Sequence, residues 1–239
     1  MPEHIGIVGC SAEGAALCYR TICEEGERYL GTYAHPEVSM HTHSLADYLR
    51  SIEAGNWRGV AELLLSSAAK LMKAGANFLI CPDNTIHQAL PLARSRSPLA
   101  WLDIAEVVAT EALECGYRSV GILGTRWLME SDVYPQALTA RGLRYVCPEP
   151  AEREEIHRII MRQLVYGVFE REAVEYHQHV IARMKQQGAD AVVLACTEIP
   201  LLMNHQNSPL PTLDSTRLLA RAALARAVGL ANSRVSSNR

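Results

Sequence analysis

Lysine is scarce in this chain, with only Lys70, Lys73 and Lys185. All three lie in expected helices that lead into strands, so none is placed at a strand exit to form a Schiff base with pyridoxal phosphate. The pattern Gly-x-x-x-x-Gly-Lys-Ser/Thr is absent, and Gly6-x-x-Gly9 does not complete Gly-x-Gly-x-x-Gly. Neither a phosphate loop nor a dinucleotide-binding loop is therefore indicated. We expect a protein that uses no cofactor.

Other absences concern location, partners and metals. No apolar run approaches the roughly 20 residues needed to cross a bilayer, and the start Met1-Pro2-Glu3-His4 lacks the features of a signal peptide. A net charge of -3 gives no reason to expect nucleic-acid or membrane-surface binding. The seven cysteines form no Cys-x-x-Cys pair and the nine histidines no His-Glu-x-x-His, so no metal site is indicated. We therefore expect a cytoplasmic protein.

Short β-branched runs alternate with longer helical patterns, which indicates βαβ units and parallel sheets. The expected strands are residues 4–9, 36–41, 77–82, 99–103, 119–124, 143–147, 189–195 and 212–214. The expected helices are residues 56–74, 105–114, 131–140, 152–166, 170–187 and 215–228. Gly75, Gly116 and Gly188 stand where helix C-caps belong, and the tail from Ser233 to Arg239 is expected to be frayed.

The chain also contains an internal repeat. The segment from Gly75 to Thr85 matches the segment from Gly188 to Glu198, and in that register Asp83 falls opposite Cys196. Two further matches keep the same order, residues 5–10 with 120–125 and residues 97–103 with 208–214. We expect an α/β protein of two pseudo-symmetric lobes, each a parallel sheet flanked by helices. The first lobe is expected at residues 1–98 plus about 212–239, and the second at residues 99–211.

In open parallel sheets, ligands bind beyond the carboxyl ends of the strands. Polar residues gather at these ends, and two facing lobes would bring both sets to one interlobe cleft, a common place for a small-ligand site. The candidate site residues are Ser11, Asp83, Asn84, Thr85, Thr125, Cys196, Thr197 and Glu198.

One thiol and one carboxylate at equivalent strand ends suit proton transfer at a carbon next to a carboxylate. A thiolate can remove the proton, and a carboxylate can do so where burial raises its pKa. Hydroxyl and amide groups such as those of Ser11, Asn84, Thr85 and Thr197 would then hold the substrate and stabilise the enediolate-like charge.

Three of the candidates have a structural alternative. Asp83 could instead cap the helix expected to start at Asn84. His87 lies in the first turn of that helix and could be either a binding or a structural residue. Glu198 could be a capping-box residue or a partner that tunes Cys196. The sequence leaves each of these alternatives open.

These residues resemble the aspartate/glutamate racemase family of the Asp/Glu/hydantoin racemase superfamily. The likeness rests on residues 5–9, on Asn84-Thr85-x-His87, on residues 122–126 with Met129, and on Gly188-Ala189 leading to Cys196-Thr197-Glu198-Ile199-Pro200. It covers nearly the whole chain and is greatest for the branch that acts on L-aspartate and L-glutamate. The resemblance implies two pseudo-symmetric lobes, no cofactor, a homodimer, and proton transfer at the alpha carbon by two opposed residues.

The chain departs from the family pattern at three places. Asp83 stands where the family has its first catalytic cysteine, while Cys81 lies two residues earlier. The first turn reads Gly9-Cys10-Ser11-Ala12-Glu13 in place of Gly-Gly-Met-Ser, and a basic residue that many members carry before a glycine in the second lobe is missing near Tyr166-Gly167.

Three functions follow from this pattern. The first is a cofactor-independent racemase or epimerase of an acidic amino acid or related carboxylate, with Cys196 and Asp83 as the proton carriers. The second is a single-cysteine isomerase, decarboxylase or hydrolase that uses the same pocket. The third is a non-catalytic ligand-binding homologue.

Overall fold

The computed structural model describes residues 1–230, and these form two compact units. Unit 1 comprises Met1–Val107 and the described residues from Thr216 onward, and unit 2 comprises Val108–Ser215. The chain passes between the units within helix α5 (Ile104–Glu114) and at the start of helix α11 (Ser215–Ala227). The frayed tail expected from residue 233 onward, and the last part of the expected first lobe, lie outside the described residues.

Unit 1 is built on a four-stranded parallel sheet with the strand order β2-β1-β3-β4. Its elements before α5 are β1 (Ile5–Gly9), α1 (Ala12–Leu30), β2 (Val38–Thr42), α2 (Leu45–Glu53), α3 (Trp57–Lys73), β3 (Phe78–Ile80), the 3-10 helix η1 (Thr85–Ala89), α4 (Leu90–Arg94) and β4 (Ala100–Trp101).

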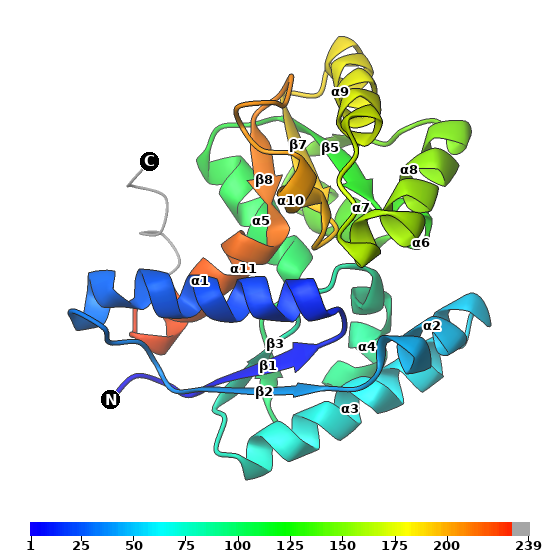
Figure 1. Cartoon of the computed structure of the whole chain (residues 1–239). Coiled ribbons are helices and arrows are strands. Elements are labelled where there is room, and N and C mark those ends of the chain that lie inside the picture. The colour runs from blue at the N-terminus through cyan, green and yellow to red at the C-terminus, as the bar shows by residue number, and fades with distance from the viewer. Residues whose placement is uncertain (231–239) are drawn as a thin grey trace. The chain divides into compact units, whose positions relative to one another are not determined.

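Helices cover both faces of this sheet (Figure 1). On one face, Ile5, Ile7 and Phe78 pack against apolar residues of α1 and α11 in a fully buried cluster. Arg221 of α11 also holds the carboxylate of Glu25 on α1 at 2.8 to 3.0 Å. Helix α3 lies along the other face, against β1 and β2. Burial on both faces is typical of parallel sheets and explains why the strands are continuous apolar runs.

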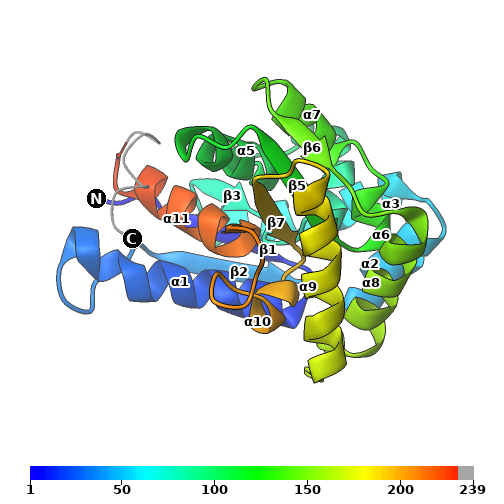
Figure 2. The ribbon, with the colours of Figure 1, turned by 90° about the horizontal axis from the view of Figure 1, so that it is seen from above.

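Unit 2 repeats this plan with the strand order β6-β5-β7-β8, again all parallel. Its elements are β5 (Ser119–Gly124), α6 (Arg126–Met129), α7 (Val133–Thr139), β6 (Arg144–Val146), α8 (Pro150–Arg162), the 3-10 helix η2 (Leu164–Tyr166), α9 (Arg171–Gln186), β7 (Ala191–Ala195), α10 (Ile199–Leu202) and β8 (Thr212–Asp214). Figure 2, seen from above, shows helices α8 and α9 of this unit beside each other. Both helices contact the central strand β5.

The strand registers confirm the internal repeat. Ile5 pairs with Phe78 in unit 1, and the matching residues Val120 and Ala191 pair in unit 2. The pairing of the third strand with the fourth also repeats, since Leu79 faces Trp101 where Val192 faces Thr212. The two sheets therefore share order, direction and register, as the two-lobe α/β expectation requires.

Most expected elements are present, with ends that shift by a few residues. The glycines expected at helix ends adopt the left-handed conformation, with φ of 97° at Gly75, 78° at Gly116 and 94° at Gly188. Helices α1 and α2 were not expected from the sequence. Helix α1 carries Gly14 and Gly26 among its buried residues, and Gly26 is needed because a side chain there would lie 2.9 Å from the carbonyl oxygen of Ala34. Such glycines lower helix propensity, so only packing reveals this helix.

No helix within residues 1–230 is both long enough and apolar enough to span a membrane.

Equivalent side-chain hydrogen bonds connect the first and third strands in each of the two units. Asn77 Oδ1 accepts the backbone N–H of His4 at 2.6 Å. At the equivalent place in unit 2, the carboxylate of Asp190 accepts the backbone N–H groups of Arg118 at 2.8 Å and Ser119 at 3.1 Å. Side-chain acceptors thus satisfy backbone donors just outside the ladder.

We expect Asp190→Ala to lower the free energy of unfolding by about 1.5 to 3 kcal/mol, because it removes hydrogen bonds from a charged acceptor to backbone donors. Asp190→Asn keeps one acceptor oxygen and should lose about half as much. Urea unfolding followed by circular dichroism measures both values. Equal stability of Asp190→Ala and the wild type would contradict this role.

Candidate active site

The Asp83 segment lies at the carboxyl end of β3 in unit 1. Asp83 is partly exposed, whereas Asn84 and Thr85, which follow it, are buried at 2% and 7% exposure. Asp83 Oδ1 accepts the backbone N–H of Ile86 at 3.2 Å, so this carboxylate caps the turn that opens η1. The capping contact expected as an alternative role for Asp83 is therefore present, although it starts a 3-10 helix rather than an α-helix at Asn84.

His87 links this segment to the start of α5. Its Nδ1 lies 2.7 Å from the carbonyl oxygen of Asp83 and its Nε2 lies 3.3 Å from the backbone nitrogen of Ile104. A carbonyl can only accept and an amide N–H can only donate, so Nδ1 carries the hydrogen and Nε2 accepts. Both ring nitrogens are thus engaged by the backbone, and this arrangement supports the structural alternative for His87.

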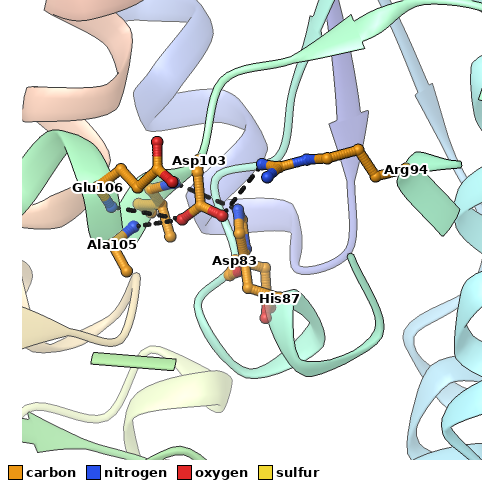
Figure 3. Close-up of polar contacts among 7 residues, drawn as sticks. Asp83, His87, Arg94, Asp103, Ala105 and Glu106 are labelled. Carbon is orange, nitrogen blue, oxygen red and sulfur yellow. Dashed lines mark hydrogen bonds and ion pairs between the residues drawn. The ribbon is translucent and has the colours of Figure 1, made fainter. Parts of the chain in front are cut away.

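Asp103 completes the same connection, as Figure 3 shows. Its Oδ1 accepts the backbone N–H of Ala105 at 3.0 Å and of Glu106 at 3.4 Å, and its Oδ2 pairs with Arg94 at 3.2 Å. Asp103 and His87 together satisfy donors at the first turn of α5, which are otherwise left without intrahelical partners. This network holds the loop that carries Asp83 against a helix end.

Cys81 is not a suitable substitute for the cysteine that the family pattern has at the position of Asp83. It is buried at 1% exposure, two residues before Asp83. Burial, and then the neighbouring charge of Asp83, raises the pKa of the Cys81 thiol well above its ordinary value. A thiol that stays protonated near neutral pH is a poor base, so Cys81 is not suited to remove a proton.

The Cys196 segment follows β7 in unit 2 and is buried throughout. Glu198 Oε2 accepts two hydrogen bonds, one from Cys196 Sγ at 3.0 Å and one from Thr197 Oγ1 at 2.7 Å. The exposure of the three side chains lies between 3% and 7%. The Glu198 side chain makes no capping hydrogen bond to α10, so its carboxylate serves Cys196 and Thr197 rather than the helix. The structure brings these three residues into direct contact.

Gly124 is needed for the close approach of β5 to this segment. A Cβ atom at Gly124 would lie 2.8 Å from the carbonyl oxygen of Ala195, immediately before Cys196. The next residue, Thr125, accepts the backbone N–H of Leu128 at 3.3 Å through its hydroxyl and so caps α6. Ser11 plays the same part in unit 1, where it accepts the N–H of Gly14 at 3.2 Å at the start of α1.

Two arginines that could bind a substrate carboxylate form ion pairs within the protein. Arg50 pairs with Asp47 at 3.4 Å on the surface of α2, and Arg126 pairs with Glu154 at 3.2 Å. Among residues 1–230, no group of three or more histidine, cysteine, aspartate or glutamate side chains could hold a metal ion.

One buried polar group was not expected from the sequence. Tyr48 of α2 is fully buried; burial, and then Cys81, Cys10 and Asp83, raises the pKa of its hydroxyl, and Ser67 partly opposes that rise. In the sequence, Tyr48 stands at helical spacing from Leu45 and Ile52, a pattern that indicates an ordinary core residue. Nothing in that pattern indicates the polar surroundings of this hydroxyl, which only side-chain packing reveals.

Comparison with known proteins gives a consistent family. The profile of the Asp/Glu/Hydantoin racemase family matches residues 6–223. The crystal structure of a putative Asp/Glu racemase from Yersinia pestis has 29% identity and a TM-score of 0.86, covering 95% of this chain and 99% of that one. An aspartate racemase homologue from Pyrococcus horikoshii has 28% identity and a TM-score of 0.81, with the same coverage.

A curated relative extends the comparison beyond solved structures. The broad specificity amino-acid racemase RacX of Bacillus subtilis is 23% identical over 164 residues, which cover 67% of this chain and 69% of RacX. This match agrees with the family profile, which covers most of the chain, and with the two similar structures, because all of them are racemases or racemase homologues. The chain therefore belongs to the Asp/Glu/hydantoin racemase family and is an isomerase of the racemase type.

Proposed function

We propose that this protein is a cofactor-independent racemase or epimerase of an acidic amino acid or related carboxylate, with Cys196 and Asp83 as the two acid/base groups. The observation that carries the proposal is the buried contact between Cys196 Sγ and the Glu198 carboxylate. Both side chains of this contact are buried, and a buried carboxylate beside an acid/base cysteine is suited to orient its proton.

The reaction requires one group to remove the alpha proton and the other to return a proton to the opposite face of that carbon. Cys196 acts as a thiolate toward one enantiomer and becomes a thiol, while the C–H electron pair enters an enediolate. Asp83 in its carboxylic acid form then donates its proton to the carbon and becomes a carboxylate. The reverse direction exchanges the two roles, so protons and charge balance over a cycle.

The polar neighbours of these two groups are suited to bind the substrate. The hydroxyls of Ser11, Thr85, Thr125 and Thr197 and the amide of Asn84 are the proposed substrate-binding donors, since they follow the strand ends beside Cys196 and Asp83. Such fixed donors stabilise charge that develops on the substrate carboxylate in the transition state.

We expect the wild type to exchange the alpha proton of L-aspartate or L-glutamate for deuterium and to form the D-enantiomer, and Cys196→Ala to abolish that inversion. Proton NMR in deuterium oxide measures exchange, and chiral chromatography measures inversion. Cys115→Ala is a matched control, because Cys115 also donates to a carboxylate, Glu111 at 3.5 Å, but lies at the end of α5. Full inversion by Cys196→Ala would refute the proposed role of this cysteine.

Asp83→Asn separates acid/base chemistry from capping. Asparagine keeps the oxygen that accepts from Ile86 but cannot take up a proton, so we expect stability to change little and inversion to fall by about 100-fold or more. Exchange of the enantiomer that Cys196 serves should continue without inversion. Asp103→Asn, a second capping aspartate changed in the same way, should keep both activities, whereas unchanged inversion by Asp83→Asn would leave Asp83 as a cap only.

The capping bond of Asp83 also favours a second function, a one-sided reaction that uses Cys196 alone. A carboxylate engaged with Ile86 is less free to act as a base. A single-cysteine isomerase, decarboxylase or hydrolase would change the composition or connectivity of the substrate. Mass spectrometry of the products distinguishes decarboxylation and hydrolysis from racemisation, which leaves the mass unchanged in ordinary water. Proton NMR distinguishes an isomerisation, which also keeps the mass but changes the connectivity of the substrate.

We expect Glu198→Gln to lower kcat by about 10- to 100-fold with a smaller change in KM, because the amide can still hydrogen-bond the thiol but cannot accept its proton. Steady-state inversion rates measured across pH give both parameters. Glu111→Gln, which changes the partner of Cys115 in the same way, should have wild-type kinetics. An unaltered kcat in Glu198→Gln would assign Glu198 a structural role only.

A further inference from the structure

A cluster of basic side chains lies at the end of the edge strand β2 and includes none of the candidate active-site residues. His41 belongs to β2, His43 follows that strand, and Lys70 comes from α3, which packs against β2 (Figure 1). The rings of His41 and His43 lie 4.9 Å apart, edge to face. Lys70 Nζ lies 2.9 Å from His41 Nε2. Three groups that can carry a positive charge therefore meet at one place in unit 1.

Two serines of α3 hold the histidine rings in place. An ammonium can only donate, so Lys70 donates to His41 Nε2, and the ring hydrogen of His41 is on Nδ1. Nδ1 donates this hydrogen to Ser67 Oγ, a fully buried group, at 3.0 Å. His43 Nε2 lies 3.1 Å from the hydroxyl of the preceding residue, Ser66. Both rings are thus fixed by hydrogen bonds from one side, while each remains partly exposed.

No carboxylate compensates the charge of this cluster. His41, His43 and Lys70 form no ion pair with any residue in the range 1–230. The side chain of Lys70 is exposed and uses one of its three N–H donors on His41. The other two donors are available to a ligand from solution.

The same positive charge acts on the protonation of both rings. Burial, and then Lys70 and His43, lowers the pKa of His41. Burial, and then Lys70 of α3, lowers the pKa of His43, and Asp47 of α2 partly opposes that change. Both rings are therefore neutral at neutral pH in the ligand-free protein. An anion beside Lys70 would offset its charge, so anion binding and proton uptake by the rings favour each other.

We propose that His41, His43 and Lys70 form a binding site for a small oxyanion with two negative charges, such as a phosphate group. The anion enters between Lys70 and His41, and the ammonium turns from Nε2 to an oxygen of the anion. Nε2 then takes up a proton from solvent and donates it to a second oxygen, which gives charge-assisted hydrogen bonds from both sides. The inference is independent of the proposed racemase chemistry.

The surrounding charges favour a small ion over a nucleic acid or another polyanion. Asp47 and Glu62 lie on α2 and α3, the helices beside the cluster, and pair there with Arg50 and Arg96. The whole chain has a net charge of -3. A polyanion needs an extended row of cations, whereas acidic side chains alternate with basic ones on these two helices.

Sulfate is the first probe, because it stays doubly charged over the pH range in which histidine titrates. Proton NMR of the histidine rings gives the pKa values of His41 and His43, and the variants His41→Asn and His43→Asn assign their signals. We expect sodium sulfate to raise both pKa values by about 0.5 or more above those in sodium chloride of equal ionic strength, which corrects for screening. Affinity for sulfate should rise by about 3- to 10-fold when the pH is lowered by one unit near these pKa values, since half to one proton is taken up per ion.

Lys70→Gln tests the cation of the site. We expect this variant to lose the difference between sulfate and chloride, and its two rings to have higher pKa values without sulfate, because Lys70 lowers both. Lys73→Gln removes the same charge one turn farther along α3 and should respond as the wild type does. Equal pKa values in sulfate and chloride for the wild type, or a wild-type response of Lys70→Gln, would overturn the proposal. So would an equal effect of sulfate on His205, a histidine of unit 2 outside the cluster.

The source of the phosphate group is decided by repeating the titration with inorganic phosphate and with glycerol 3-phosphate. Tighter binding of the ester assigns the site to the phosphate group of a larger molecule, and tighter binding of inorganic phosphate assigns it to the free ion. If neither shifts the signals of His41 and His43, the phosphate assignment is wrong. None of these measurements requires turnover, so failure of the racemase proposal leaves their interpretation unchanged.

Discussion

Parallel pairing of the first and third strands in each unit is the constraint on which the other features depend. It places the ends of β1 and β3 at one edge of the first sheet, and the ends of β5 and β7 at one edge of the second. Helices on both faces make this pairing stable, because parallel sheets are buried on both sides. The segments after these strands are consequently the places where polar side chains can gather, and Asp83 and Cys196 occupy equivalent positions in the repeat.

The two copies of the repeat have diverged in the chemistry of these segments. In unit 2, a buried carboxylate accepts from the thiol of Cys196 and from the hydroxyl of Thr197, so its polar groups are directed at one another. In unit 1, the side chain of Asp83 caps a turn and the ring of His87 is held between two backbone groups. The first arrangement is suited to handling a proton, while the second combines the proposed acid/base group Asp83 with the structural residue His87. This asymmetry is why the Asp83 position decides between racemisation and a one-sided reaction.

Backbone hydrogen bonds account for the polar residues that surround Asp83 in unit 1. The carboxylate of Asp103 and both ring nitrogens of His87 have backbone partners, so the buried ring of His87 needs no ligand to complete its hydrogen bonds.

The sequence by itself determined the alternation of strands and helices, the repeat, and the strand-end positions of Asp83 and Cys196, because strand periodicity and glycine placement are local signals. It did not predict α1 or α2, since buried glycines and short length weaken those patterns. Only the tertiary structure decided that Glu198 serves Cys196 rather than a helix end, and that both nitrogens of His87 are engaged by backbone. Each of these depends on which side chains meet across elements far apart in sequence or around a tight turn, and hydrogen-bond geometry of that kind leaves no periodic trace in the chain.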